Sequence, residues 1–275
     1  MDKILLCYNN KNMDNEFIIK LIVSFLGAGI WITVMTLLAE KLGSKVGGLI
    51  ANLPANILFS LMCVGFIQGA DFAAEASRAA PIGMVIVTIF IFSIINLLPY
   101  GLKRALGLSI LIWLPLAVLT NLWEYKNWLG GIIIYLITTA VLFWILEHYC
   151  HLPAVEQTKK KYTAGQILGR AVFAGSIIAL VIILAEFSPP YLVGIFATFP
   201  SGVTSTIYIL TRNQSPAFAQ ATGKILVLSS SNIIIYALGV FLTYPLLGVI
   251  WGTIISFLAS FIWVWIFHPV IKKVS

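Results

Sequence analysis

The stretch GGLIANLPANIL, residues 47–58, places a proline and two asparagines inside one of the longest apolar runs of the chain. Proline has no backbone N–H and its ring clashes with the carbonyl one turn back, so a helix kinks or breaks there. The pattern G-x-x-A-x-x-P in this stretch recurs 146 residues later, at 194–200. The sequence therefore predicts two equivalent helix breaks, one at Pro54 and one at Pro200.

The composition identifies the solvent around these breaks. The chain has 275 residues, of which 60% are hydrophobic and only 10% charged, and a soluble domain of this size cannot hide so much apolar surface. The 17 basic residues fall in short gaps between apolar runs rather than in a groove with aromatic residues, which argues against nucleic acid as a partner. A membrane protein is therefore expected, with the lipid bilayer as its surroundings.

The residue types that carry metal, redox or covalent chemistry show no suitable spacing. The three cysteines, Cys7, Cys63 and Cys150, form no C-x-x-C pair, and the histidines have no metal-ligand spacing. The sequence has no phosphate-binding loop, nucleophile elbow or H-E-x-x-H motif. We therefore expect no enzyme activity, no cofactor and no metal site.

The apolar runs have the length that a helix needs to cross a bilayer, about 20 residues. Nine such runs are expected, near residues 17–40, 46–69, 77–98, 104–122, 128–147, 165–187, 191–211, 216–242 and 247–268. The predicted fold class is an all-α polytopic membrane protein with about nine transmembrane helices. The expected divisions are an extracytoplasmic segment (1–16), a first repeat of five spans (17–147), a cytoplasmic basic linker (148–164) and a second repeat of four spans (165–275).

The basic residues also orient the chain. With the N-terminus outside, the cytoplasmic loops and the C-terminal tail hold twelve of the 17 Lys and Arg residues, including those at 159–161. Basic loops resist translocation, so this bias favours an extracytoplasmic N-terminus and a cytoplasmic C-terminus. The expected location is the prokaryotic cell (inner) membrane.

The chain reads as two copies offset by 146 residues. The ungapped alignment pairs Glu40 with Glu186 and Pro99 with Pro245, among 14 identities over the 72 positions 28–99. The chain has only ten acidic residues, so a matched pair at the ends of apolar runs supports a duplication. Five spans separate the start of one copy from the start of the next, and an odd number turns the second copy over in the membrane. Inverted repeats are a recurring transporter architecture, with the site at the repeat interface.

The broken helices carry the residues that are expected to bind a solute. Each half-helix that starts after a proline has a partial positive charge at its N-terminus, and two such ends near mid-membrane suit an anionic group. Gly202 has no side chain to cover the backbone N–H groups at one of these ends. The expected substrate-binding residues lie beside the two prolines and in the eighth span: Asn52, Pro54, Asn56, Thr198, Pro200, Ser201, Gly202, Thr204 and Asn232.

Within this set Ser201, Thr204 and Thr198 are expected to make the main contacts, because the second copy carries a hydroxyl-rich run after its proline. Asn52 and Asn56 are expected to complete the site. The alternative is that each proline is a simple kink and the nearby hydroxyls bond back to backbone carbonyls. For Asn232 and the serines before it, hydrogen bonding between helices is the alternative to substrate contact.

Four charged residues are candidates for coupling or gating. Arg78 and Lys224 are equivalent in the two copies, and they either extend to opposite interfaces or form two basic gates for an anion. Glu40 and Glu186 end the first and sixth spans. Glu40 has lysines nearby in the sequence, which favours an interfacial role, whereas Glu186 has apolar flanks and is either interfacial or a proton carrier.

The G-x-x-A-x-x-P segment and the small polar residues after it, at 45–70 and 191–216, resemble the core of small bacterial membrane proteins of the GlpM/DUF3147 type. The chain resembles two such units fused head to tail. The resemblance implies no substrate, so the function has to come from the residues themselves.

The residues favour a secondary transporter for a small anionic solute or a lipid-linked phosphate. The sequence contains no nucleotide-binding motif, so the energy is expected from an ion gradient or from downhill flow. The expected partners are the bilayer and a small molecule or ion, and a homodimer is left open. The alternatives are an ion channel or lipid scramblase that uses the same broken helices, and an accessory membrane subunit without transport.

Overall fold

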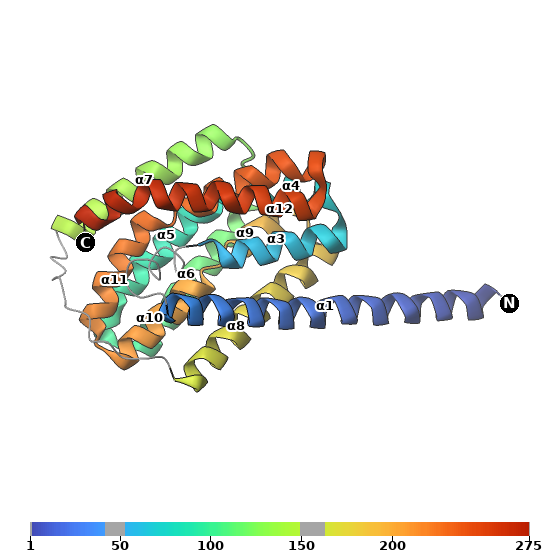
Figure 1. The fold of residues 1–275 in the computed structure, drawn as a ribbon, viewed down its shortest axis with the longest axis horizontal. Helices are drawn as coiled ribbons and strands as arrows, with labels where there is room; N and C mark the ends of the chain where they lie inside the picture. Colours follow the sequence, from blue (N-terminus) through green and yellow to red (C-terminus); the bar gives the residue numbers. More distant parts are fainter. Residues whose placement is uncertain (1, 42–52, 149–162, 275) are drawn as a thin grey trace.

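The computed structural model describes residues 2–41, 53–148 and 163–274, and all regular structure in these ranges is helical (Figure 1). The elements in chain order are α1 (Asp2–Lys41), α3 (Ala55–Gln68), α4 (Ala70–Ser77), α5 (Ala80–Leu97), the 3-10 turn η1 (Leu98–Tyr100), α6 (Leu102–Thr120), α7 (Trp128–His148), α8 (Ala164–Phe187), α9 (Pro190–Ala197), α10 (Ser201–Asn213), α11 (Pro216–Ser229) and α12 (Asn232–Val274). Seven segments of the described chain are long and apolar enough to cross a bilayer. The protein is therefore an all-α polytopic membrane protein, as predicted.

The expected spans correspond to these segments with three adjustments. The last of the seven runs from Pro216 to Ile266 and holds both the eighth and the ninth expected spans. The second expected span is present as α3, a shorter apolar helix, while residues 42–52 lie outside the described ranges. The helix α1 is longer than its expected span, since it begins at Asp2 and extends beyond the bundle (Figure 1).

The helix α12 is two antiparallel arms joined at Gly248. This residue has φ +74° and ψ 176°, a conformation that suits glycine because it has no Cβ. The hydroxyl groups of Tyr244 and Thr253 are 2.7 Å apart across the bend, and the hydroxyl of Ser260 donates to the carbonyl of Asn232. The bend separates the eighth expected span from the ninth.

A serine-rich turn divides the segment that the sequence predicts as a single helix over 216–242. The helix α11 ends at Ser229, and α12 begins at Asn232. The hydroxyl of Ser230 donates to the carbonyl of Leu226. Serine hydroxyls compete with the backbone for its own hydrogen bonds, and three in succession favour a turn. The prediction of one continuous helix is therefore wrong at this point.

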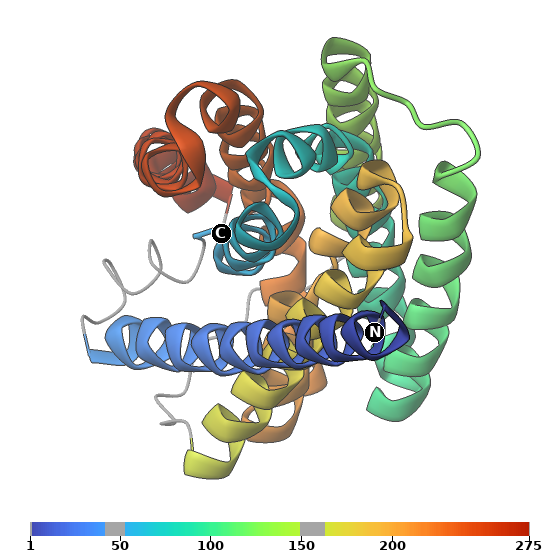
Figure 2. The same ribbon diagram turned by 90° about the vertical axis from the view of Figure 1, so that its right-hand side faces the viewer.

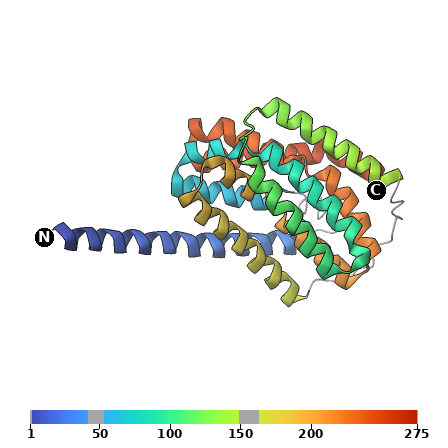
Figure 3. The same ribbon diagram turned by 180° about the vertical axis from the view of Figure 1, so that it is seen from behind.

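Two segments are enclosed by the rest of the protein. The segments Ala80–Tyr100 and Pro190–Asn213 are 67% buried, whereas the other five spans are 33% buried or less. Accordingly α5 packs against α6, α7, α9, α11 and α12. Figure 2 shows α9 between α12 on one side and α6 on the other. The outer helices, among them α1 and α7 on opposite sides of the bundle in Figure 3, present their apolar side chains outward, as lipid requires.

The glycine of the G-x-x-A-x-x-P pattern allows α9 to approach its neighbours closely. Gly194 packs against the end of α4 so closely that an added Cβ would lie 2.7 Å from the carbonyl carbon of Ala76. It would also lie 2.9 Å from the Cβ of Ala79, the residue before α5. Contacts this short between helices need a residue without a side chain. They hold α9 against the α4–α5 connection.

Candidate functional site

The two prolines, 146 residues apart, adopt the same local structure. Pro54 has φ −78° and ψ 52°, and Pro200 has φ −79° and ψ 51°. In each case the residue after the proline donates its N–H to the carbonyl of the residue before it, at 2.8 Å. These values describe an inverse γ-turn, which proline favours because its ring holds φ near this value. A helix starts directly after each turn, α3 at Ala55 and α10 at Ser201.

Both new helices start without a side-chain cap. The carbonyl of the proline accepts the N–H four residues on, at 3.0 Å in α3 and 2.9 Å in α10. The N–H groups of the first turn lie at Asn56 and Ile57 in α3 and at Gly202 and Val203 in α10. All four residues line one cavity. The first turns of two helices, whose N-termini are positively polarised, therefore border the same space.

This central cavity has a volume of about 170 Å³. Both proline turns border it, together with parts of α1, α5 and α8 and the junction of α11 with α12. Its lining residues are Ile32, Met35, Leu53, Pro54, Ala55, Asn56, Ile57, Val87, Arg170, Ala174, Ala197, Thr198, Phe199, Pro200, Gly202, Val203, Ser205, Thr206, Leu226, Ser230, Asn232 and Ile233. A space of this size holds several water molecules or a small solute.

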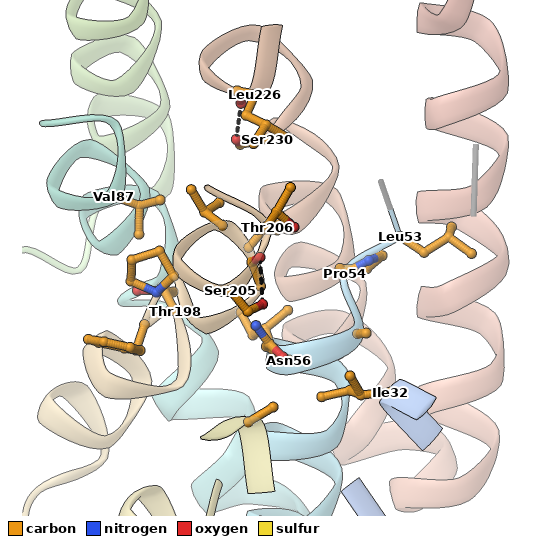
Figure 4. Close-up of a pocket in the computed structure, with 18 of the residues that line it drawn as sticks. Ile32, Leu53, Pro54, Asn56, Val87, Thr198, Ser205, Thr206, Leu226 and Ser230 are labelled. Carbon is orange, nitrogen blue, oxygen red and sulfur yellow. Dashed lines mark hydrogen bonds between the residues drawn. The ribbon is translucent and has the colours of Figure 1, made fainter. Parts of the chain in front are cut away.

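Asn56 reaches from the start of one helix to the start of the other. Its Nδ2 lies 3.4 Å from the position that a Cβ on Gly202 would occupy. Figure 4 shows its side chain directed towards Ser205, whose hydroxyl donates to the carbonyl of Gly202 at 3.0 Å. The Asn56 amide therefore lies within van der Waals reach of the first turn of α10.

The hydroxyl residues selected from the sequence lie around the cavity rather than all in it. Thr198 borders it, but its hydroxyl donates to the carbonyl of Ile195 at 2.7 Å. The hydroxyl of Thr204 donates to the carbonyl of Pro200 at 2.7 Å. Ser201 is 1% exposed and is absent from the lining of the central cavity. Back-bonding to the helix, the alternative weighed above, therefore describes Thr198 and Thr204 as the structure has them.

Two asparagines complete the set of expected contacts. Asn232 borders the cavity at the first residue of α12, 1% exposed, and its carbonyl accepts the hydroxyl of Ser260. Asn52 lies outside the described residues, as does the side chain of Glu40. Ser205 and Thr206, which the sequence-based selection leaves out, both line the cavity.

The basic residues Arg78 and Lys224 lie outside the cavity lining and form ion pairs. Arg78 bonds to Glu75 at 3.2 Å and to the carbonyl of Lys126 at 3.2 Å. Lys224 pairs with Glu147, the penultimate residue of α7. Both ends of α7 are thus tied to the rest of the protein by charge.

Lys126, in the connection before α7, joins the ion pair of Arg78 and Glu75 to form a cluster. It pairs with Glu124 at 3.0 Å and with Glu75 at 3.2 Å. The hydrogen bonds that its ammonium donates to Glu124 first, and then to Glu75, raise the pKa of Lys126. The cluster therefore favours the charged form of this lysine.

Glu186, a candidate proton carrier in the sequence, ends α8 with an exposed side chain. Its carboxylate accepts a hydrogen bond from the amide of Gln68 at 2.9 Å. It does not border the central cavity. An amide donor from another helix supplies the partner that the neighbouring sequence lacks.

Arg170 borders the central cavity, and the sequence analysis did not select it. It lies seven residues after Thr163, whose side chain caps the N-terminus of α8. A basic residue near the start of a span ordinarily sets the orientation of the helix in the membrane, so a binding role for it is hard to recognise from sequence. The available signal was its position inside the expected span 165–187, where ionisable residues are costly.

Comparison with known proteins matches part of the N-terminal half of the chain. Residues 21–125 match the family model of a protein of unknown function (DUF3147). The match contains the Pro54 turn and ends before α7, and over these residues it confirms the family resemblance seen in the sequence. No curated protein and no solved structure matches the chain. The resemblance of 191–216 to the same unit stays a prediction.

Proposed function

We propose that the protein is a secondary transporter for a small anionic solute, which it binds in the central cavity between the two proline turns. The observation that carries this proposal is the convergence of two uncapped helix N-termini on one cavity. Helix N-termini attract anions through their N–H groups and their partial positive charge. The volume of about 170 Å³ favours a small ion over a lipid headgroup with its chains.

The proposal includes an inverted repeat, and the packing of α1 on α8 supports it. A Cβ added to Gly29 would lie 3.4 Å from the carbonyl oxygen of Ala171, and one added to Gly175 would lie 2.8 Å from that of Phe25. Adding 146 converts Gly29 into Gly175 and Phe25 into Ala171, so each contact is the counterpart of the other. The step from Gly29 back to Phe25 on α1 corresponds to the step from Ala171 forward to Gly175 on α8. The two helices therefore run antiparallel. Equivalent helices that pack antiparallel fit copies related by an axis in the membrane plane.

The helix α7 supports the inversion in a second way. The family match ends at residue 125, so the repeating unit holds four of the expected spans and α7 lies outside it. A unit with an even number of spans starts and ends on the same side of the membrane. One further crossing, by α7, turns the following copy over. In this proposal α7 is a connector between two four-span units rather than the fifth span of the first.

The transport proposal is tested with the variant Asn56→Asp in proteoliposomes. The carboxylate sits in the first turn of α3, where a helix tolerates a negative charge, so the fold is retained. For two negative charges about 4 Å apart at an effective dielectric constant of about 20, the repulsion is about 4 kcal/mol. That energy weakens anion binding roughly a thousandfold. The matched control is Asn127→Asp, since Asn127 accepts the N–H of Gly130 at the start of α7, away from the cavity.

The assay follows uptake of labelled chloride, phosphate, sulfate and small carboxylates, each tested separately. We expect saturable uptake of one anion by the wild type and by Asn127→Asp, and loss of that uptake in Asn56→Asp. Equal uptake by both variants would contradict the site. Flux that does not saturate would favour a channel, and movement of labelled lipid between leaflets would favour a scramblase. If no solute moves, the remaining alternative is an accessory membrane subunit without transport.

A further inference from the structure

A second cavity adjoins the central one. It has a volume of about 570 Å³ and lies between α6, α8 and α10. On α8 it is bordered by Gly165, Gly169 and Phe173, which are four residues apart and so share one face of the helix. An added Cβ at Gly165 or Gly169 would meet no atom within 4 Å. We call this cavity the vestibule.

The vestibule and the central cavity share two lining residues, Arg170 and Ser205. These residues therefore stand at the junction of the two spaces, one on α8 and one on α10. The vestibule also has a polar rim, where Gln166 donates to Asn213 at 2.6 Å and accepts from it at 3.1 Å. Polar groups there suit the interfacial end of α8, which begins at Ala164.

The described residues that border the two cavities carry charge of one sign. Among the described residues, Arg170 is the one charged side chain that borders either cavity. Arginine stays protonated at every physiological pH and binds carboxylate, phosphate and sulfate oxygens through its planar guanidinium. Its charge adds to the partial charges of the two helix N-termini deeper in. A cavity walled by one sign of charge concentrates ions of the other sign.

We propose that the vestibule is the route by which a small oxyanion reaches the central cavity, and that Arg170 binds it at the junction. This inference rests on the proposed function, because it names the substrate class and the path for the same site. With the orientation predicted from the basic loops, the vestibule faces the cytoplasm, since α8 follows the loop at 159–161. The route ends where Ser205 and Asn56 meet beside the α10 N-terminus.

The test uses a thiol as a reporter and needs no knowledge of the natural substrate. Ser205→Cys is made in a full-length chain without its three native cysteines, and is checked by size-exclusion chromatography in nanodiscs. The probes are methanethiosulfonates that carry a sulfonate or a trimethylammonium group. Each rate is divided by the rate of the same probe with a small free thiol. The ratio of the normalised rate of the anionic probe to that of the cationic probe isolates the effect of charge, because a change in the thiol pKa alters both rates alike.

We expect the anionic probe to be favoured by about tenfold or more, as a cleft of one charge produces. Arg170→Gln should abolish the preference and Arg170→Lys should keep most of it. Gly169→Leu should slow both probes by filling the vestibule. Its matched control is Gly107→Leu on α6, where an added side chain also meets open space but borders neither cavity, and it should change nothing.

Three results would overturn the inference. They are no reaction at Ser205→Cys with either probe, an unchanged charge preference in Arg170→Gln, and equal rates in the two leucine variants. If the probes behave as expected but proteoliposomes move no anion, the route stands and the transport proposal alone fails. If an anion is transported while Ser205→Cys is unreactive, transport stands and this route is wrong.

Discussion

Gly194→Ala should destabilise the protein, although the change adds a single methyl group. The added Cβ would lie 2.7 Å from the carbonyl carbon of Ala76 and closer still to its oxygen, where ordinary contacts begin at 3.4 Å. The obstacle is backbone, which cannot rotate away as a side chain does, so α9 has to move off α4. Overpacking of this kind costs about 3 kcal/mol at the upper end of its usual range. The higher helix propensity of alanine returns about 1 kcal/mol.

The expected net loss is therefore about 2 kcal/mol, the difference of these two terms. The measurement is equilibrium unfolding in mixed micelles, followed by far-UV circular dichroism. Gly107→Ala is the control, because an added Cβ there meets nothing within 4 Å and only the propensity gain of about 1 kcal/mol applies. A Gly194→Ala protein as stable as the wild type, or more stable, would refute the close packing of α9 on α4.

Three further outcomes are expected. Trp113 packs edge-on against Phe199, with ring centroids 4.8 Å apart. Trp113→Ala should therefore lower the free energy of unfolding by about 3–5 kcal/mol in the same assay, and Trp113→Phe by much less. Equal losses in the two variants would contradict the view that this aromatic contact supports the Pro200 turn. Glu147→Gln should lower the melting temperature slightly, because it removes the ion pair with Lys224. The double variant Lys224→Glu with Glu147→Lys exchanges the two charges and should restore the melting temperature. The coupling energy should be at most about 1 kcal/mol, because Glu147 is half exposed. An unchanged melting temperature in Glu147→Gln would show that the ion pair is energetically neutral. A cysteine placed in the loop at 159–161 should react only with a cytoplasmic reagent, and labelling from outside would reverse the predicted orientation.

The helices were predictable because lipid acts on every residue of a span. A bilayer demands runs of about 20 apolar residues with all backbone groups bonded internally, and both demands are visible in sequence. The start of a helix directly after Pro54 and after Pro200 was predictable for a different reason. Proline acts through its own ring and its missing N–H, so no tertiary neighbour has to be known.

The side chains that face the cavity were less predictable. After Pro200 the run of hydroxyl residues turns by about 100° per residue, and the rotation of α10 about its axis decides which of them face inward. Packing against α8 and α11 sets that rotation, and it places Ser205 and Thr206 inward and Ser201 elsewhere. Arg170 was missed for a similar reason, since only the approach of α8 to α10 gives it a place between two cavities.

The continuity of the chain through α7 has a consequence for assembly. Two separate four-span proteins would associate in an equilibrium that depends on their density in the bilayer, and dilution with lipid would separate them. In the arrangement proposed above, α7 joins the two halves and holds them at an effective concentration that dilution does not change. The contact of α1 with α8 can then be individually weak and still remain formed at any ratio of protein to lipid. In that arrangement the pairing of the two halves does not depend on how much of the protein the membrane holds.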